Sequence, residues 1–143
     1  ADSVHFLGYR RDLTTIAAAS DAVILSSDNW RTPVSLIEAS AAARPAVATT
    51  VGGVREVVTD ETGILVPPGD SSALAGAIGR LAADSGLRAS LGVRAREHAT
   101  GRYSADRLVD DIDSLYREIL DGKTIAADRP AAGTRPASIE SDA

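Results

Sequence analysis

The residues from Thr32 to Glu38 have the types and spacing of an anion-binding helix start. Pro33 suits the first position of a helix, and Thr32 can cap it. The free amide groups of Val34 and Ser35, supported by the helix dipole, could then bind an anion such as a diphosphate. Glu38 follows about one and a half turns later, where its carboxylate could accept two hydrogen bonds from a ribose diol. An ordinary helix start with a solvated surface acid remains open as the alternative.

This segment belongs to a pattern in which short apolar strands alternate with amphipathic helices. We expect strands at residues 4–7, 22–25, 46–49 and 63–66. We expect helices at residues 13–17, 33–44, 54–58, 71–83, 87–98 and 105–120. This alternation over short connections predicts an α/β fold, a parallel Rossmann-like sheet with helices on both faces. Ligands of such sheets bind beyond the carboxyl ends of the strands, which is where the helix at Pro33 begins.

The length of the chain and the loss of its apolar periodicity near the C-terminal end predict one domain followed by a tail. A chain of 143 residues is long enough to bury its own core. We expect that domain over residues 1–121. Residues 122–143 are rich in Ala and contain Pro130, Gly133 and Pro136, a composition typical of disorder.

Composition and charge exclude several classes of function. The net charge is -5 and the sequence has no basic stripe, so no nucleic-acid partner is expected. The absence of cysteine excludes disulfides, thiolate zinc sites and a Cys nucleophile. His5 and His98 lack a third ligand at metal spacing, so neither a metal nor another cofactor is expected. With no targeting segment, we expect a cytoplasmic protein, and a peripheral place at the inner membrane face stays open.

Six segments follow one another in an order that is specific when taken together. They are Val4 to Tyr9, Ser20 to Ser27, Thr32 to Ala39, Arg44 to Thr49, Val51 to Val58 and Thr62 to Asp70. In this order they resemble the family-4 retaining glycosyltransferases, which have the GT-B fold. The resemblance covers about residues 4 to 120 and points to the second, nucleotide-sugar-binding domain of that fold.

The resemblance implies the transfer of a hexose from a UDP- or GDP-sugar to an acceptor hydroxyl, with retained anomeric configuration and without a metal. It places Glu38 at the ribose and the amides of Val34 and Ser35 at the diphosphate or sugar. The loop that contains Tyr9 and Arg10 would lie beside the nucleobase. Because the family's acceptor-binding domain and diphosphate-gripping cations lie upstream, we expect an incomplete donor domain that is inactive as an isolated chain.

The sequence departs from the family pattern at the first signature glutamate. Counting back from Glu38 places that acid at position 30, where this chain has Trp30, followed by Arg31 in place of the usual Gly. The exchange removes a hydrogen-bond acceptor near the donor sugar and reverses the local charge. Asp28 could substitute for it only if the loop is rearranged. No catalytic residue is assigned. The predicted substrate-binding residues are Tyr9, Arg10, Trp30, Arg31, Thr32, Pro33, Val34, Ser35 and Glu38.

A second departure is Ala43, which stands where the family commonly has Gly. If this position needs a positive φ, Ala costs about 1 kcal/mol there.

The competing function is a non-catalytic domain that binds a nucleotide sugar or a protein through a degenerate site. A nucleotide-sugar epimerase of the same fold is a third hypothesis. The donor base, the sugar and the acceptor stay open. An uncovered sheet edge also predicts a homodimer or a swapped assembly.

Overall fold

The computed structural model describes residues 3–29 and 33–121. The chain divides into two compact units, residues 1–108 and 109–143. The expected tail at residues 122–143 lies outside the described ranges, so the domain boundary near residue 121 stays a prediction.

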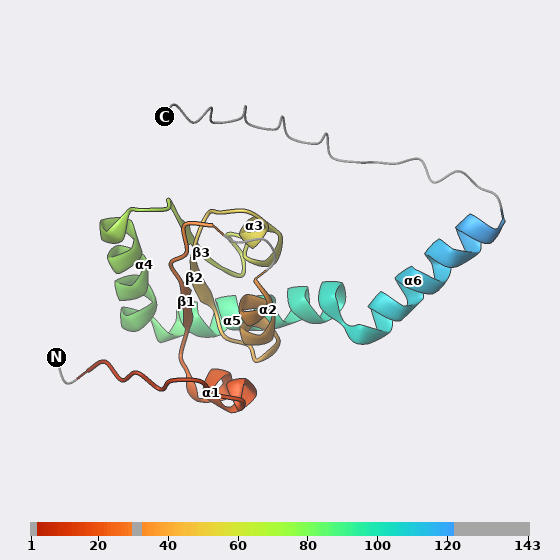
Figure 1. Cartoon of the computed structure of the whole chain (residues 1–143). Coiled ribbons are helices and arrows are strands. Elements are labelled where there is room, and N and C mark those ends of the chain that lie inside the picture. Colours follow the sequence, from red (N-terminus) through yellow and green to blue (C-terminus); the bar gives the residue numbers. More distant parts are fainter. Residues whose placement is uncertain (1–2, 30–32, 122–143) are drawn as a thin grey trace, which may run out of the picture. The chain divides into compact units, whose positions relative to one another are not determined.

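A parallel sheet of three strands forms the centre of the first unit. The strands are β1 (Val23–Leu25), β2 (Ala46–Thr49) and β3 (Gly63–Val66), in the order β1-β2-β3 (Figure 1). In the register of the sheet, Val47 lies between Ile24 of β1 and Ile64 of β3. The predicted α/β class with a parallel sheet is therefore confirmed.

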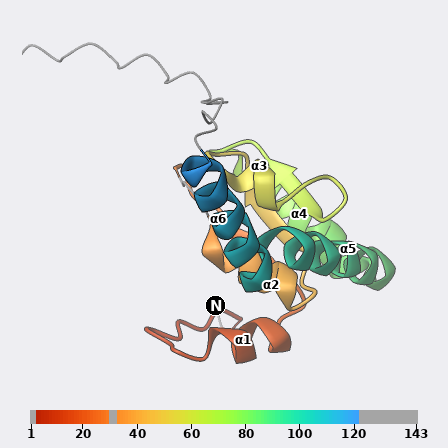
Figure 2. The same cartoon turned by 90° about the vertical axis from the view of Figure 1, so that its right-hand side faces the viewer.

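Helices cover both faces of this sheet. The helices of the first unit are α1 (Leu13–Ala19), α2 (Val34–Ala41), α3 (Val54–Val57), α4 (Ser71–Ala83) and α5 (Ser85–Tyr103). The last helix, α6 (Ala105–Leu120), belongs mostly to the second unit. Figures 1 and 2 show α2 and α3 on one side of the strands and α4 on the other. In chain order α2 follows β1, α3 follows β2 and α4 follows β3, the alternation that the crossover connections of a parallel sheet require.

The core consists of two apolar clusters, one on each face of the sheet. Leu36 of α2 and Val54 of α3 pack on one face, and Leu81 of α4 packs against Val47 on the other. All four residues of β2 are buried, because both faces of this strand are covered. Its continuous small apolar sequence is typical of a central parallel strand.

Residues 4–7 do not form the strand that their apolar sequence predicts. They pair with no strand in the described part of the chain, and the side chain of Phe6 is 95% exposed. A strand depends on a hydrogen-bonded neighbour, which an apolar pattern alone does not supply. The prediction of a strand at this place is wrong.

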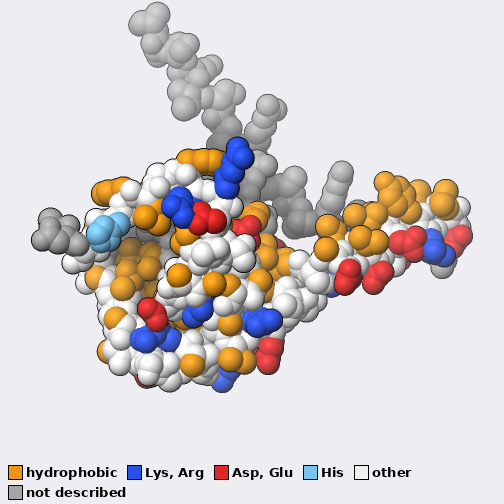
Figure 3. All heavy atoms as spheres, turned by 90° about the horizontal axis from the view of Figure 1, so that it is seen from below, with side chains coloured by type: hydrophobic (Ala, Val, Ile, Leu, Met, Phe, Trp, Pro, Cys, Tyr) orange, Lys and Arg blue, Asp and Glu red, His pale blue; other side chains and the backbone are white. Residues whose placement is uncertain are grey.

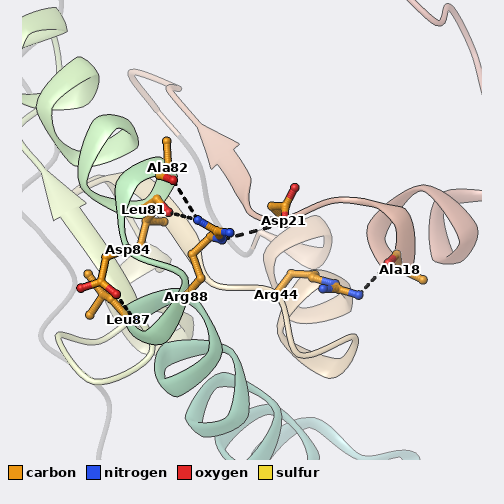
Figure 4. A network of polar contacts seen from close by, with 8 residues as sticks. All are labelled: Ala18, Asp21, Arg44, Leu81, Ala82, Asp84, Leu87 and Arg88. Atoms are coloured by element: carbon orange, nitrogen blue, oxygen red, sulfur yellow. Dashed lines mark hydrogen bonds and ion pairs between the residues drawn. The ribbon is translucent and has the colours of Figure 1, made fainter.

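Arg88 of α5 holds the corner between α4 and α5. Its guanidinium donates to the carbonyl oxygens of Leu81 at 2.5 Å and Ala82 at 3.0 Å, and it lies 3.8 Å from the Asp21 carboxylate (Figure 4). These carbonyl groups at the end of α4 have no partner further along their own helix. Arg88 therefore ties the helix pair to the residues that lead into β1.

The turn between α2 and β2 places an alanine in the left-handed region. Ala43 has a φ of 58°, so the position needs the positive φ that glycine adopts without a Cβ penalty. The amide of Ala43 donates to the Ser40 carbonyl, and that of Arg44 donates to the Ala39 carbonyl, each at 2.9 Å. These bonds end the helix and fix the turn.

Replacing Ala43 by Gly should raise the free energy of unfolding by about 1 kcal/mol, because the strain at this φ is removed. Urea unfolding would measure the change. Ala41→Gly is the matched control, since Ala41 is exposed in the last turn of α2 and should lose about 0.5–1 kcal/mol. Equal losses in both variants would contradict the expectation.

The helix α6 is amphipathic. Figure 3 shows hydrophobic side chains along one side of it and charged side chains along the other. None of its residues is buried. Its apolar stripe is exposed and includes Leu108, Ile112, Leu115, Tyr116 and Ile119. Within residues 3–29 and 33–121, no helix combines the length and hydrophobicity that a membrane crossing requires.

Candidate functional site

The helix α2 begins beyond the carboxyl end of β1, at the edge of the sheet where ligands of α/β proteins bind. Its first residue is Val34, and Pro33 occupies the preceding cap position with φ -80° and ψ 85°. The carbonyl oxygen of Pro33 accepts bonds from the amides of Leu36 at 3.0 Å and Ile37 at 3.3 Å. The predicted start at Pro33 is therefore one residue early, because its ψ is not helical.

The first turn of α2 presents amide groups to the solvent. Val34 and Ser35 are exposed, and among the described residues neither amide has a hydrogen-bond acceptor. Such unpaired amides at a helix start carry a partial positive charge. They can donate to the oxygens of a phosphate or diphosphate.

Glu38 lies one turn further along the same helix. It is exposed, and within the described ranges its carboxylate pairs with no cation or donor. Residues four apart lie on the same face of a helix, with a rise of about 6 Å between them. Glu38 is thus placed to accept hydrogen bonds from a ligand whose anionic part lies against Val34 and Ser35.

Tyr9 and Arg10, two further predicted binding residues, belong to the segment before α1. Tyr9 is 87% exposed and Arg10 follows it. The guanidinium of Arg10 donates to Asp12 at 2.7 Å, which raises the pKa of Arg10 and lowers that of Asp12. In the described part of the chain no hydrogen bond joins Tyr9 or Arg10 to α2.

Three predicted residues cannot be placed. Trp30, Arg31 and Thr32 lie outside the described residues. Of the predicted residues that the structure describes, Pro33, Val34, Ser35 and Glu38 lie together on α2 or at its start.

A cavity of about 170 Å³ lies beyond the carboxyl ends of the three strands, and the sequence analysis did not find it. Ser26 and Asp28 after β1, Thr49 of β2 and Asp70 before α4 contribute to its lining. Asp70 caps α4 by accepting the Ala73 amide at 2.8 Å. The one available signal was Thr49, a polar residue in an otherwise apolar buried strand.

A larger cavity of about 380 Å³ lies between β1 and α4, on a flank of the sheet. Ile24, Ile78 and Leu81 contribute to its apolar lining. Ile78 of α4 is 38% exposed. The guanidinium of Arg88, the cation at this cavity, already donates to two carbonyl groups.

The sequence similarity to known proteins spans the elements that build this site. The sequence model of the family described as "Glycosyl transferases group 1" matches residues 1–84, more than half of the chain. The chain belongs to this family. The group 1 glycosyl transferase assignment confirms the resemblance read from the six sequence segments, and the GT-B fold class with it. In the described ranges of this group 1 glycosyl transferase, no three His, Asp or Glu residues gather as metal ligands would.

Several relatives align with most of this chain. A D-inositol 3-phosphate glycosyltransferase of Saccharomonospora viridis is 39% identical over 77% of the chain and 26% of the relative. An exopolysaccharide phosphotransferase of Streptomyces coelicolor is 41% identical over 83% of the chain and 13% of the relative. The structure of Anabaena HepE in complex with UDP is 30% identical, with a TM-score of 0.74 over 85% of the chain and 33% of HepE. The chain therefore spans about a third or less of the length of these relatives.

Proposed function

We propose that this chain is the donor-binding part of a retaining hexosyltransferase and that it binds a nucleotide-diphosphate sugar at α2. The observation that carries the proposal is that the exposed residues Val34 and Ser35, whose amides have no described acceptor, lie one turn before the exposed Glu38 on the same helix. The amides suit the diphosphate and the carboxylate suits the ribose diol. The similarity to HepE, which was solved with UDP, supports a uridine nucleotide as the first donor to test.

Calorimetric titration with UDP, UDP-glucose and GDP tests this proposal. We expect UDP and UDP-glucose to bind, and the comparison with GDP to reveal the preferred base. Uridine is the matched control ligand, because it lacks the diphosphate that the start of α2 would hold. The absence of binding by all three diphosphates at millimolar concentration, or equal binding of uridine, would refute the proposal.

We further propose that this chain does not transfer a sugar by itself. It spans a third or less of its named relatives, and the remaining part of such proteins would have to position the acceptor and exclude water. Each of these effects can lower a barrier by several kcal/mol. Incubation of the chain with UDP-glucose and candidate acceptors should therefore give no product beyond hydrolysis in buffer.

The second candidate function is a non-catalytic binding domain. It is favoured by Trp30 and Arg31, which stand where the family pattern has Glu and Gly. The double variant Trp30→Glu with Arg31→Gly separates the two candidates. If the chain retains a donor-sugar site, the restored carboxylate should strengthen binding of UDP-glucose relative to UDP. An unchanged ratio of the two affinities would favour the non-catalytic function.

A further inference from the structure

Thr49 connects two strands at the point where their main-chain pairing ends. The pairing of β1 with β2 stops at Leu25 and Ala48, and Thr49 has a register partner only in β3. Its side chain is buried, with 4% exposed. The hydroxyl donates to the carbonyl oxygen of Ser27 at 2.5 Å and also lies 3.4 Å from that of Leu25. The side chain of Thr49 thus connects β2 to the residues that follow β1, beyond the last main-chain pair of the two strands.

The Thr49 hydroxyl bonds specifically to the Ser27 carbonyl oxygen. A threonine hydroxyl has a single proton, and the shorter distance assigns it mainly to Ser27. Removing the hydroxyl leaves the Ser27 carbonyl without this donor in a part-buried place, which costs more than an exposed bond would. Ser27 lies seven positions before Val34, where α2 begins. The bond therefore fixes the first part of the connection whose far end presents the amides of α2.

We infer that Thr49 is a positioning residue for donor binding. Its hydroxyl holds the residues that directly follow β1, residues 26–29, in one conformation beyond the carboxyl end of the strand. The inference rests on the proposed function, because the proposed donor site lies beyond the same end of β1, at the start of α2. Thr49 itself is 4% exposed and is assigned no contact with the donor.

The test compares Thr49→Val, which keeps the shape and removes the hydroxyl, with Thr49→Ser, which keeps the hydroxyl. Thr62→Val is the matched control, since Thr62 is also buried and its hydroxyl accepts the Thr59 amide at 2.8 Å. Thr62 precedes β3 at the amino end of the strands, whereas α2 begins beyond the carboxyl end of β1. We expect Thr49→Val to weaken UDP-glucose binding about three- to tenfold, while Thr49→Ser and Thr62→Val stay within about twofold of the original chain.

A second measurement separates this inference from the proposed function. Backbone 15N order parameters of residues 26–29 should fall in Thr49→Val and not in Thr62→Val, whether or not a nucleotide is present. Unchanged order parameters overturn the inference, and so does unchanged UDP-glucose affinity in Thr49→Val. If the original chain binds no nucleotide, the proposed function fails and the role in donor binding fails with it. The order parameters then still decide whether Thr49 holds the connection.

Discussion

Gly92→Ala is expected to lower the free energy of unfolding by about 2–3 kcal/mol, because a methyl group at position 92 has no room. Gly92 is buried in α5, and an added Cβ would overlap the carbonyl oxygen of Ala43 in the turn after α2. The obstacle is backbone, so relief requires α5 to move away from α2. The loss exceeds the gain of about 0.5–1 kcal/mol that Ala brings to a helix interior. Urea or thermal unfolding followed by circular dichroism would measure the loss.

Gly101→Ala is the control for this prediction. Gly101 lies in the same helix and is exposed, and an added Cβ would meet no atom within 4 Å. Only the gain in helix propensity remains there, so Gly101→Ala should be more stable than the original chain by up to about 1 kcal/mol. If Gly92→Ala is as stable as Gly101→Ala, the close approach of α5 to the turn at Ala43 is wrong.

Glu38→Ala should weaken the binding of UDP by about 1–3 kcal/mol, which corresponds to about 5- to 150-fold in the dissociation constant. The reason is the loss of a charged acceptor for the ribose hydroxyls. Because Glu38 is exposed and pairs with no described residue, its removal should leave the folded structure and its stability nearly unchanged. Calorimetric titration at one salt concentration would measure the affinity, and thermal unfolding would confirm that the fold is intact.

Glu61→Ala is the matched control for Glu38. Glu61 is likewise an exposed glutamate, and it lies in the turn before β3, at the amino end of the strands, whereas α2 begins beyond the carboxyl end of β1. Its removal changes the net charge equally, so any general electrostatic effect on UDP appears in both variants. Equal affinities in the two variants would refute the assignment of Glu38 to the ribose. Glu38→Gln should recover part of the affinity, since an amide oxygen still accepts a hydrogen bond.

Residues that begin or end helices and strands made much of the fold predictable. The bounds of β2, β3 and α4 agree with the prediction, since Pro45 and Pro67 limit the strands and Asp70 caps the helix. The predicted end of α5 near His98 is too early, because the helix continues to Tyr103. The imidazole of His98 and the hydroxyl of Tyr103 both lie within hydrogen-bond distance of the Glu56 carbonyl oxygen, at 3.0 and 2.9 Å. These bonds to a residue 42 and 47 positions earlier stabilise the end of α5, and no local sequence pattern predicts them.

The candidate site was predictable only where one helix builds it. Val34, Ser35 and Glu38 share a face of α2, and helical spacing alone groups them. Tyr9 and Arg10 belong to another segment, whose place depends on tertiary structure. The bond from Thr49 to Ser27 joins residues 22 positions apart and depends on the register of β1 against β2. Neither relation can be obtained from spacing, so the sequence could not reveal them.

The weak attachment of α1 has a consequence for proteolysis. None of its residues is buried, and its described links to the sheet include one bond from Arg44 to the Ala18 carbonyl at 2.6 Å (Figure 4). A helix with so little buried surface opens at a small fraction of the free energy that global unfolding requires. Trypsin should therefore cut after Arg10 or Arg11 while the sheet and α2 remain folded. The nicked protein would keep Glu38 on its helix without the segment that contains Tyr9, and would be the smallest unit in which the two halves of the predicted site could be studied apart.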